Sequence, residues 1–205
     1  MQIKLDDLST PLTYFTMTQS VVPRPIAWIL SENEDAGFNL APFSYFNAVC
    51  SDPPLVMISI GLQDDGSEKD SLRNIKQRSQ FVIHIASCDQ LPELNQSSAT
   101  LPPGESEVLA NNLQTTPVEG FHMPRLSDCK IALMCERYAI QTIGNSNQQS
   151  LLFAEIREIY VDDSCVEVSD QGRLKILADR VQPLARLGAS QYASFGEVLV
   201  AERPN

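Results

Sequence analysis

The fold is decided by residues 24–47, which read RPIAWILSENEDAGFNLAPFSYFN. An apolar run, a polar turn that contains Gly37, and a second apolar run predict a β-hairpin. The second run carries Asn39, Ser44 and Asn47 among four aromatic residues. Because buried amides and hydroxyls need hydrogen-bonding partners, this strand suits a flat ligand that is rich in nitrogen and oxygen.

Length and charge narrow the class of protein. The chain has 205 residues, 15 basic and 26 acidic side chains, and a formal net charge of −11. This length predicts one domain that is large enough to bury a core without disulfide or metal cross-links. Binding to nucleic acid or to an anionic membrane needs a basic surface, so we expect neither as a partner. Any anionic ligand needs a local group of cations.

The cysteines and the N-terminus indicate a reducing compartment. The five cysteines are an odd number and contain no Cys-x-x-Cys pair. The N-terminus becomes acidic at Asp6 and Asp7, unlike a signal peptide. No apolar run approaches the ~18 residues that span a bilayer. We therefore expect a soluble, cytoplasmic protein with free thiols.

Short strands dominate the rest of the pattern. We expect strands at residues 14–18, 55–60, 80–86, 130–140, 151–161 and 195–201. A helix is expected at 71–78, with Leu72 and Ile75 facing the core, and two short helices are expected between residues 88 and 119. Many short strands with few helices indicate an antiparallel barrel or sandwich.

The start of the helix at residues 71–78 is a candidate phosphate site. The first turn of a helix presents unpaired N–H groups and the positive end of the helix dipole. Lys69, Ser71 and Arg73 add cations and a hydroxyl there. The same residues also suit an ordinary solvated helix start, and Asp70 opposes a phosphate unless it points away. Ser67 and Asp70 resemble a capping box.

Arg24 is a second candidate binding residue. Pro23 and Pro25 flank it, and the residue before a proline is held in an extended conformation. The direction of the Arg24 side chain is therefore restricted. A surface arginine at the start of a strand is an equally good interpretation.

The sequence lacks the motifs of several other kinds of binding and catalytic site. The sequence contains no Gly-x-Gly-x-x-Gly and no P-loop. Its two histidines, His84 and His122, lie far apart and outside any metal-binding motif, so we expect no metal site. We interpret His84 as a hydrogen-bonded core residue and Cys135 as a buried thiol. With so few acid–base groups, we assign no catalytic side chain and expect a cofactor to supply the reactivity.

Several segments together resemble the flavin-reductase-like family of FMN-binding split barrels, which includes flavoredoxin. These segments are residues 24–28, 39–46, 52–54, 69–71 with 74–75, and 186–192. The resemblance implies a mainly β fold, a six-stranded antiparallel split β-barrel with short peripheral helices, in one domain over residues 1–205. It also implies a homodimer with one FMN per subunit near the dimer interface.

The resemblance implies a set of FMN-binding residues along the hairpin and the helix start: Arg24, Trp28, Asn39, Leu40, Ala41, Ser44, Ser59, Ile60, Gly61, Lys69 and Ser71. It places those at 39–44 along the isoalloxazine and those at 59–61 near the ribityl chain or phosphate. Lys69 and Ser71 are expected at the phosphate. An Asn side chain offers the donor and the acceptor that the pyrimidine edge of a flavin requires.

Three functions stay open at this point. The first is an FMN-dependent oxidoreductase, in which NADH or NADPH reduces the flavin and the electrons pass to a free flavin, a ferric complex or a protein. Catalysis would then rest on positioning and on exclusion of water. The second is a non-enzymatic, flavoredoxin-like electron carrier. The third is a pyridoxamine-phosphate-oxidase-like enzyme, which shares the barrel type.

Overall fold

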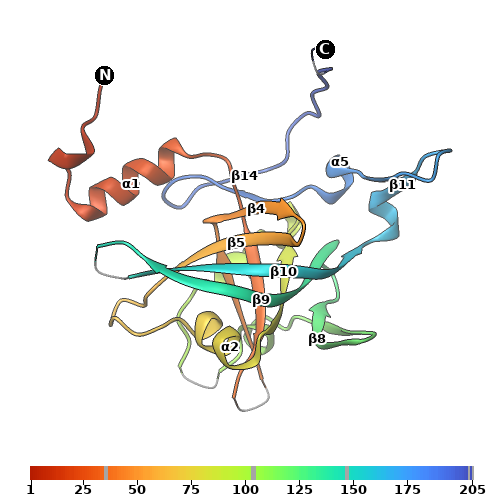
Figure 1. Cartoon of the computed structure of the whole chain (residues 1–205), viewed down its shortest axis with the longest axis horizontal. Helices are drawn as coiled ribbons and strands as arrows, with labels where there is room; N and C mark the ends of the chain where they lie inside the picture. The colour runs from red at the N-terminus through yellow and green to blue at the C-terminus, as the bar shows by residue number, and fades with distance from the viewer. Residues whose placement is uncertain (35–36, 103–104, 146–147, 203, 205) are drawn as a thin grey trace.

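The centre of the molecule is an antiparallel sheet of seven strands in the order β3-β2-β6-β9-β10-β5-β4 (Figure 1). A computed structural model describes residues 1–34, 37–102, 105–145, 148–202 and 204. The strands of the sheet are β2 (Ala27–Glu32), β3 (Phe38–Phe43), β4 (Phe46–Ser51), β5 (Pro54–Gly61), β6 (Gln80–Ile85), β9 (Ile131–Ile143) and β10 (Gln149–Val161). The predicted mainly β class is confirmed, with seven strands in the main sheet rather than six.

The two edge strands of this sheet follow each other directly in the sequence. Strand β3 ends at Phe43 and β4 begins at Phe46, although they stand at opposite ends of the strand order. A flat sheet of this size is roughly 30 Å wide at the usual strand spacing, and a two-residue link cannot cross it. The sheet therefore curls into a barrel. Among the described residues β3 and β4 do not pair, so the barrel is split along this seam.

Alternating side chains of the central strands fill two apolar clusters. Trp28 and Leu30 of β2 belong to one cluster, whereas Ile29 between them belongs to the other. Successive residues of a strand point to opposite faces, so both faces of the sheet are buried at β2. Helix α2 (Asp70–Arg78) adds Leu72 and Ile75 to the second cluster, as predicted.

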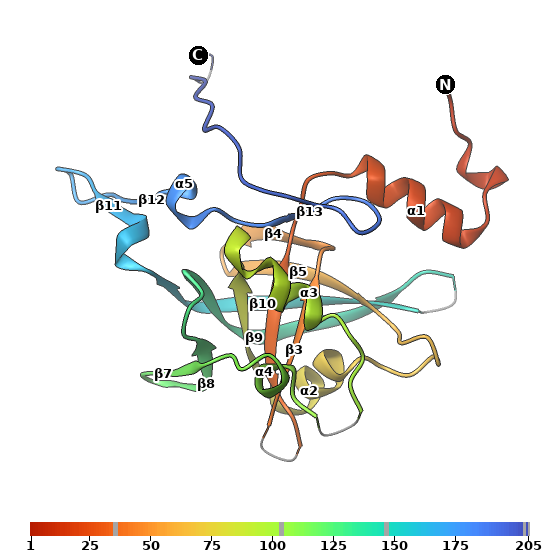
Figure 2. The same cartoon turned by 180° about the vertical axis from the view of Figure 1, so that it is seen from behind.

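Smaller elements surround the barrel (Figures 1 and 2). The other α-helices are α1 (Thr10–Ser20), α3 (Leu91–Gln96), α4 (Glu107–Ala110) and α5 (Ala178–Val181), and short 3₁₀ helices cover Leu5–Asp7, Cys88–Gln90 and Asp163–Cys165. The smaller sheets contain β1 (Arg24–Pro25), β13 (Ala185–Arg186) and β14 (Tyr192–Ala193), the pair β7 (Thr115–Val118) and β8 (Phe121–Leu126), and the pair β11 (Val166–Val168) and β12 (Leu174–Ile176). Within the part of the chain that the structure describes, no helix is both long and apolar enough to cross a membrane.

The predicted hairpin at residues 24–47 is confirmed as β2 paired with β3, with Glu32 opposite Phe38 at its closed end. Residues 35–36 of its turn lie outside the described residues. The strands predicted at 55–60, 80–86, 130–140 and 151–161 correspond to β5, β6, β9 and β10. The two helices predicted between residues 88 and 119 are α3 and α4; residues 103–104 between them are not described.

Two predicted strands are wrong. Residues 14–18 lie inside α1, because Ser9 and Pro11 start a helix ahead of them: Ser9 is the N-cap and Pro11 lies in the first turn. The segment 195–201 forms no strand, since no neighbouring strand pairs with it among the described residues. Its Leu199 side chain is 84% exposed.

The predicted capping box at Ser67 and Asp70 is also wrong. The Ser67 hydroxyl and amide both donate to the Asp65 carboxylate, at 2.6 and 2.8 Å. Lys69 is the N-cap of α2, and Asp70 forms an ion pair with Arg73. The loop before α2 is therefore held by its own side chains, which leaves the first N–H groups of the helix free of a side-chain cap.

The predictions for His84 and Cys135 are confirmed. Both residues are 0% exposed, and Cys135 is a free thiol. The Leu126 N–H donates to His84 Nε2 at 2.9 Å, so the proton lies on Nδ1, which donates to the Trp28 carbonyl at 3.2 Å. Burial lowers the pKa of His84 to about 3. The ring stays neutral and links β2, β6 and β8.

We expect the free energy of unfolding to fall as the pH drops from about 6.5, the ordinary histidine pKa, toward 3. In this window the unfolded chain binds a proton at His84 that the folded chain rejects, which costs about 1.4 kcal/mol per pH unit. Urea titrations of wild type and His84→Gln at several pH values measure this slope. His122→Gln, at an exposed histidine, is the control. An unchanged slope in His84→Gln would contradict the assignment.

Candidate functional site

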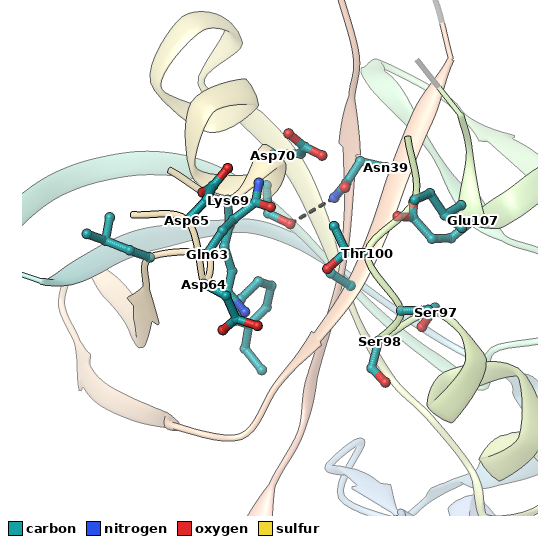
Figure 3. A pocket seen from close by; sticks show the side chains of 16 residues that line it. Asn39, Gln63, Asp64, Asp65, Lys69, Asp70, Ser97, Ser98, Thr100 and Glu107 are labelled. Atoms are coloured by element: carbon teal, nitrogen blue, oxygen red, sulfur yellow. Dashed lines mark hydrogen bonds between the residues drawn. The ribbon is translucent and has the colours of Figure 1, made fainter. Parts of the chain in front are cut away.

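A cavity of about 550 Å³ opens between β3, the loop after β5, the start of α2 and the segment that joins α3 to α4 (Figure 3). Its walls are Asn39, Ala41 and Phe43 of β3 and residues 62–65, 69–71, 97–101 and 107. Cofactor pockets commonly have this size. The cavity thus brings together the predicted aromatic strand and the predicted phosphate site.

A buried polar network fixes the floor of the cavity. Asn39 Nδ2 donates to the Ser71 hydroxyl at 2.8 Å and lies 3.4 Å from the Ser31 hydroxyl. Asn74 Nδ2 donates to the same Ser31 hydroxyl at 3.2 Å and to Asn33 Oδ1 at 2.8 Å. Because buried polar groups without partners are costly, these bonds lock the first turn of α2 onto the hairpin.

Lys69 is the cation at this end of the cavity. It is the N-cap of α2, and its ammonium lies 5.7 Å from the centre of the Phe43 ring, within cation–π range. The two nearest carboxylates in sequence are engaged elsewhere: Asp70 pairs with Arg73 and Glu68 with Lys76. Lys69 is therefore available to an anionic ligand, whereas Arg73 is held by its partner.

Residues 97–101 and Glu107 form the opposite wall, which is tied to the hairpin on both sides. The Trp28 indole N–H donates to the Ser97 hydroxyl at 2.8 Å. At the other end the Ser106 hydroxyl donates to the Phe38 carbonyl at 2.5 Å, and the Leu40 N–H donates to Glu107 Oε2 at 2.9 Å. Side chains of the wall thus occupy the open edge of β3.

Glu107 is the unexpected group in this wall. Its side chain is 6% exposed, and Figure 3 shows it among the residues around the cavity. Burial raises the pKa of Glu107, and the Leu40 N–H bond opposes that rise. Sequence reasoning missed both Glu107 and Ser97, because a polar, Pro-rich segment gives no local signal that its side chains meet strands 67 to 69 residues away.

The structure separates the predicted site residues into two groups. Asn39, Ala41, Lys69 and Ser71 line the cavity, and Leu40 borders it through its N–H. The other predicted residues lie outside the cavity lining: Arg24, Trp28, Ser44, Ser59, Ile60 and Gly61. Trp28 and Ile60 are core residues, 0% and 1% exposed.

Arg24 stands at the seam of the barrel, beside α1. It is 6% exposed, and its guanidinium donates to the carbonyls of Thr18, Val21 (2.8 Å) and Leu187 (2.7 Å). Its Nε lies 3.4 Å from the Ser44 hydroxyl. The extended conformation predicted for Arg24 is confirmed by strand β1, and the fixed direction of its side chain joins three chain segments.

Ser59 and Gly61 lie on β5 against β10. The Ser59 hydroxyl donates to Gln149 Oε1 at 3.2 Å, and Gly61 stands opposite Gln149 in the sheet register. The Ser59 N–H donates to the Tyr45 carbonyl at 2.8 Å, which ties β5 to the link between β3 and β4. Ser59 therefore lies at the seam, and neither Ser59 nor Gly61 lines the cavity.

Comparisons with known proteins agree on one family. A family model described as a flavin reductase like domain matches residues 18–176. A relative from Halalkalibacterium halodurans is 32% identical over 207 residues, which cover 100% of this chain and 97% of the relative. Nitrilotriacetate monooxygenase component B from Bacillus cereus superposes with a TM-score of 0.88, 28% identity and 98% coverage of both chains. Pseudomonas fluorescens 2-nitrobenzoate 2-nitroreductase NbaA superposes with a TM-score of 0.88 and 30% identity, over 100% of this chain and 96% of that one.

Proposed function

Because the chain belongs to the flavin reductase-like family, we propose that it is an FMN-dependent oxidoreductase. In this proposal NADH or NADPH reduces the bound FMN, and the electrons pass to a small-molecule or protein acceptor. The observation that carries it is the cavity of about 550 Å³ with Lys69 at the start of α2. A dianionic phosphate in a protein of net charge −11 needs such a local cation.

The residues around the cavity fit FMN. Lys69 and the N–H groups of Asp70 and Ser71 would hold the phosphate, since the first N–H groups of a helix have no partner within it and α2 has no side-chain cap. The Asn39–Ser71 hydrogen bond keeps that turn in position. The wall at residues 97–101 would exclude water from the ring system. Once bound, FMN supplies the hydride-accepting and electron-transferring chemistry.

Flavin binding followed by anaerobic mixing with a nicotinamide tests this function. We expect the protein to bind FMN, with quenched flavin fluorescence, and NADH or NADPH to bleach the flavin absorbance at a catalytic rate. Free flavin, a ferric complex and oxygen are then supplied as acceptors. Binding without bleaching, together with clean reduction by a protein donor, would favour the electron carrier. Oxidation of pyridoxamine phosphate with peroxide release would favour the third function. A protein that takes up no FMN would overturn the proposal.

We also propose that the protein is a homodimer. Helix α1 stands away from the barrel (Figures 1 and 2) and exposes several apolar side chains, with Leu12 53%, Tyr14 62% and Phe15 47% exposed. The Tyr14 ring lies 6.5 Å from that of Tyr45 at the seam. Strand β4 beyond the seam is an edge strand with mostly exposed residues. A group of exposed apolar side chains of this kind commonly marks a protein contact.

We expect the double variant Leu12→Asp, Phe15→Asp to be monomeric where the wild type is dimeric. Two carboxylates on the α1 face would have to be buried without partners in the interface. Size-exclusion chromatography with light scattering measures the mass. Leu174→Asp, at an exposed leucine of β12, is the matched control and should remain a dimer. A double variant of unchanged dimeric mass would place the interface elsewhere.

A further inference from the structure

Glu107 is a buried acid inside the candidate site. It begins the short helix α4, lines the cavity, and is 6% exposed. Its Oε2 atom accepts the Leu40 N–H at 2.9 Å, a bond that fixes the carboxyl group against the edge of β3. This bond therefore holds the carboxyl group at the cavity wall.

The other charged side chains that line the cavity with Glu107 are mostly negative. Helix α2 brings Lys69 and Asp70, and the loop after β5 brings Asp64 and Asp65 (Figure 3). Strand β3 carries no titratable side chain between Phe38 and Phe43. Burial and then the nearby Asp70 charge raise the pKa of Glu107, against the Leu40 N–H bond. Asp64 and Asp65 are exposed, so water screens them more than Glu107.

We propose that Glu107 sets the charge of the ligand that the cavity retains: its neutral form admits a phosphorylated flavin, and its ionised form repels the phosphate. This inference rests on the proposed function, and it assigns a role in specificity to a residue outside the predicted set. Two anions within one partly enclosed cavity repel more strongly than they do in bulk water. Glu107 thus opposes Lys69, and the balance between them depends on pH.

The variant Glu107→Gln separates charge from structure. Its amide oxygen can still accept the Leu40 N–H, but the side chain never ionises. Glu105→Gln is the matched control, because Glu105 is exposed two residues away. FMN and riboflavin dissociation constants are measured by fluorescence quenching as a function of pH for all three proteins. The thermal midpoint of each protein checks the fold.

We expect Glu107→Gln to bind FMN about tenfold more tightly than wild type on the alkaline side of the Glu107 titration, where the wild-type carboxyl is ionised. This ratio should approach one as the pH falls through the titration of Glu107. The phosphate of FMN also titrates, but it does so equally in every protein, so the ratio isolates Glu107. Riboflavin, which lacks the phosphate, should bind both proteins equally, and Glu105→Gln should match wild type.

A second measurement uses the wild-type protein and so does not depend on the folding of a variant. Because linkage is reciprocal, FMN binding should raise the pKa of Glu107, and a tenfold effect corresponds to about one pKa unit. Carbon-13 NMR of labelled glutamate carboxyls in the free and FMN-loaded wild type measures this shift. An unchanged pKa, or a Glu107→Gln affinity equal to or weaker than wild type at all pH values, would overturn the inference. A wild type that binds no FMN would instead overturn the proposed function.

Discussion

Replacing Lys69 with alanine is expected to weaken FMN binding by roughly 1.5–3 kcal/mol, which is about 10- to 150-fold in the dissociation constant. Lys69 is the cation that lines the cavity at the start of α2, and its neighbours Glu68 and Asp70 are paired with Lys76 and Arg73. The variant leaves only the helix dipole to attract the phosphate. Titration of flavin fluorescence measures the change.

Two controls show whether the loss belongs to the phosphate. Lys175→Ala removes an exposed charge on β12, outside the cavity, and should leave FMN affinity unchanged. Riboflavin should bind Lys69→Ala and wild type equally. If the FMN dissociation constant of Lys69→Ala equals that of wild type, Lys69 does not belong to the site.

Replacing Arg24 with alanine is expected to lower the free energy of unfolding by roughly 3–5 kcal/mol. The variant removes the donors for the buried carbonyl of Thr18 and the partly buried carbonyls of Val21 and Leu187, and buried acceptors without partners are costly. The join between the end of α1 and the C-terminal segment should loosen first. Urea unfolding gives the stability, and limited proteolysis near α1 reports the local opening.

The variant Arg24→Lys serves as a comparison. It keeps the positive charge, but an ammonium group cannot reproduce the planar set of N–H donors of the guanidinium group. We expect intermediate stability. The resemblance to FMN-binding split barrels places Arg24 near the flavin, whereas in the structure its donors are used within the protein. An Arg24→Ala protein of wild-type stability and reduced FMN affinity would favour a direct role at the flavin.

Local patterns predicted most of the barrel strands. The hairpin of β2 and β3 and the buried strands β5 and β6 follow from apolar runs and turn residues that are adjacent in sequence. The seam could not be predicted in this way, because it depends on β3 and β4 standing at opposite edges of the sheet. Residues 14–18 have a strand-like pattern, but Ser9 and Pro11 start α1 ahead of them. Val198 to Val200 show that an apolar run without a neighbouring strand stays exposed.

The candidate site also has parts that local sequence predicted and parts that only the fold creates. The meeting of Asn39 with Ser71 joins two segments that were each predicted to bind the ligand, and the structure brings them within 2.8 Å. Glu107 could not be predicted, because only the fold carries α4 to the edge of β3. Trp28 was predicted to bind the ligand, but it lies in the core. Its indole N–H donates to Ser97 in the cavity wall, so it supports the site from behind.

The bonds from Ser106 and Glu107 to β3 have a consequence for how molecules of this protein behave when crowded. A bare strand edge is a template on which another chain can add a strand, and such additions lead to aggregation. Here a hydroxyl and a carboxyl take up the outward carbonyl of Phe38 and the outward N–H of Leu40. If α4 loosened, the protein would therefore lose one wall of the cavity and would also expose the edge of β3, on which another chain could add a strand and start aggregation.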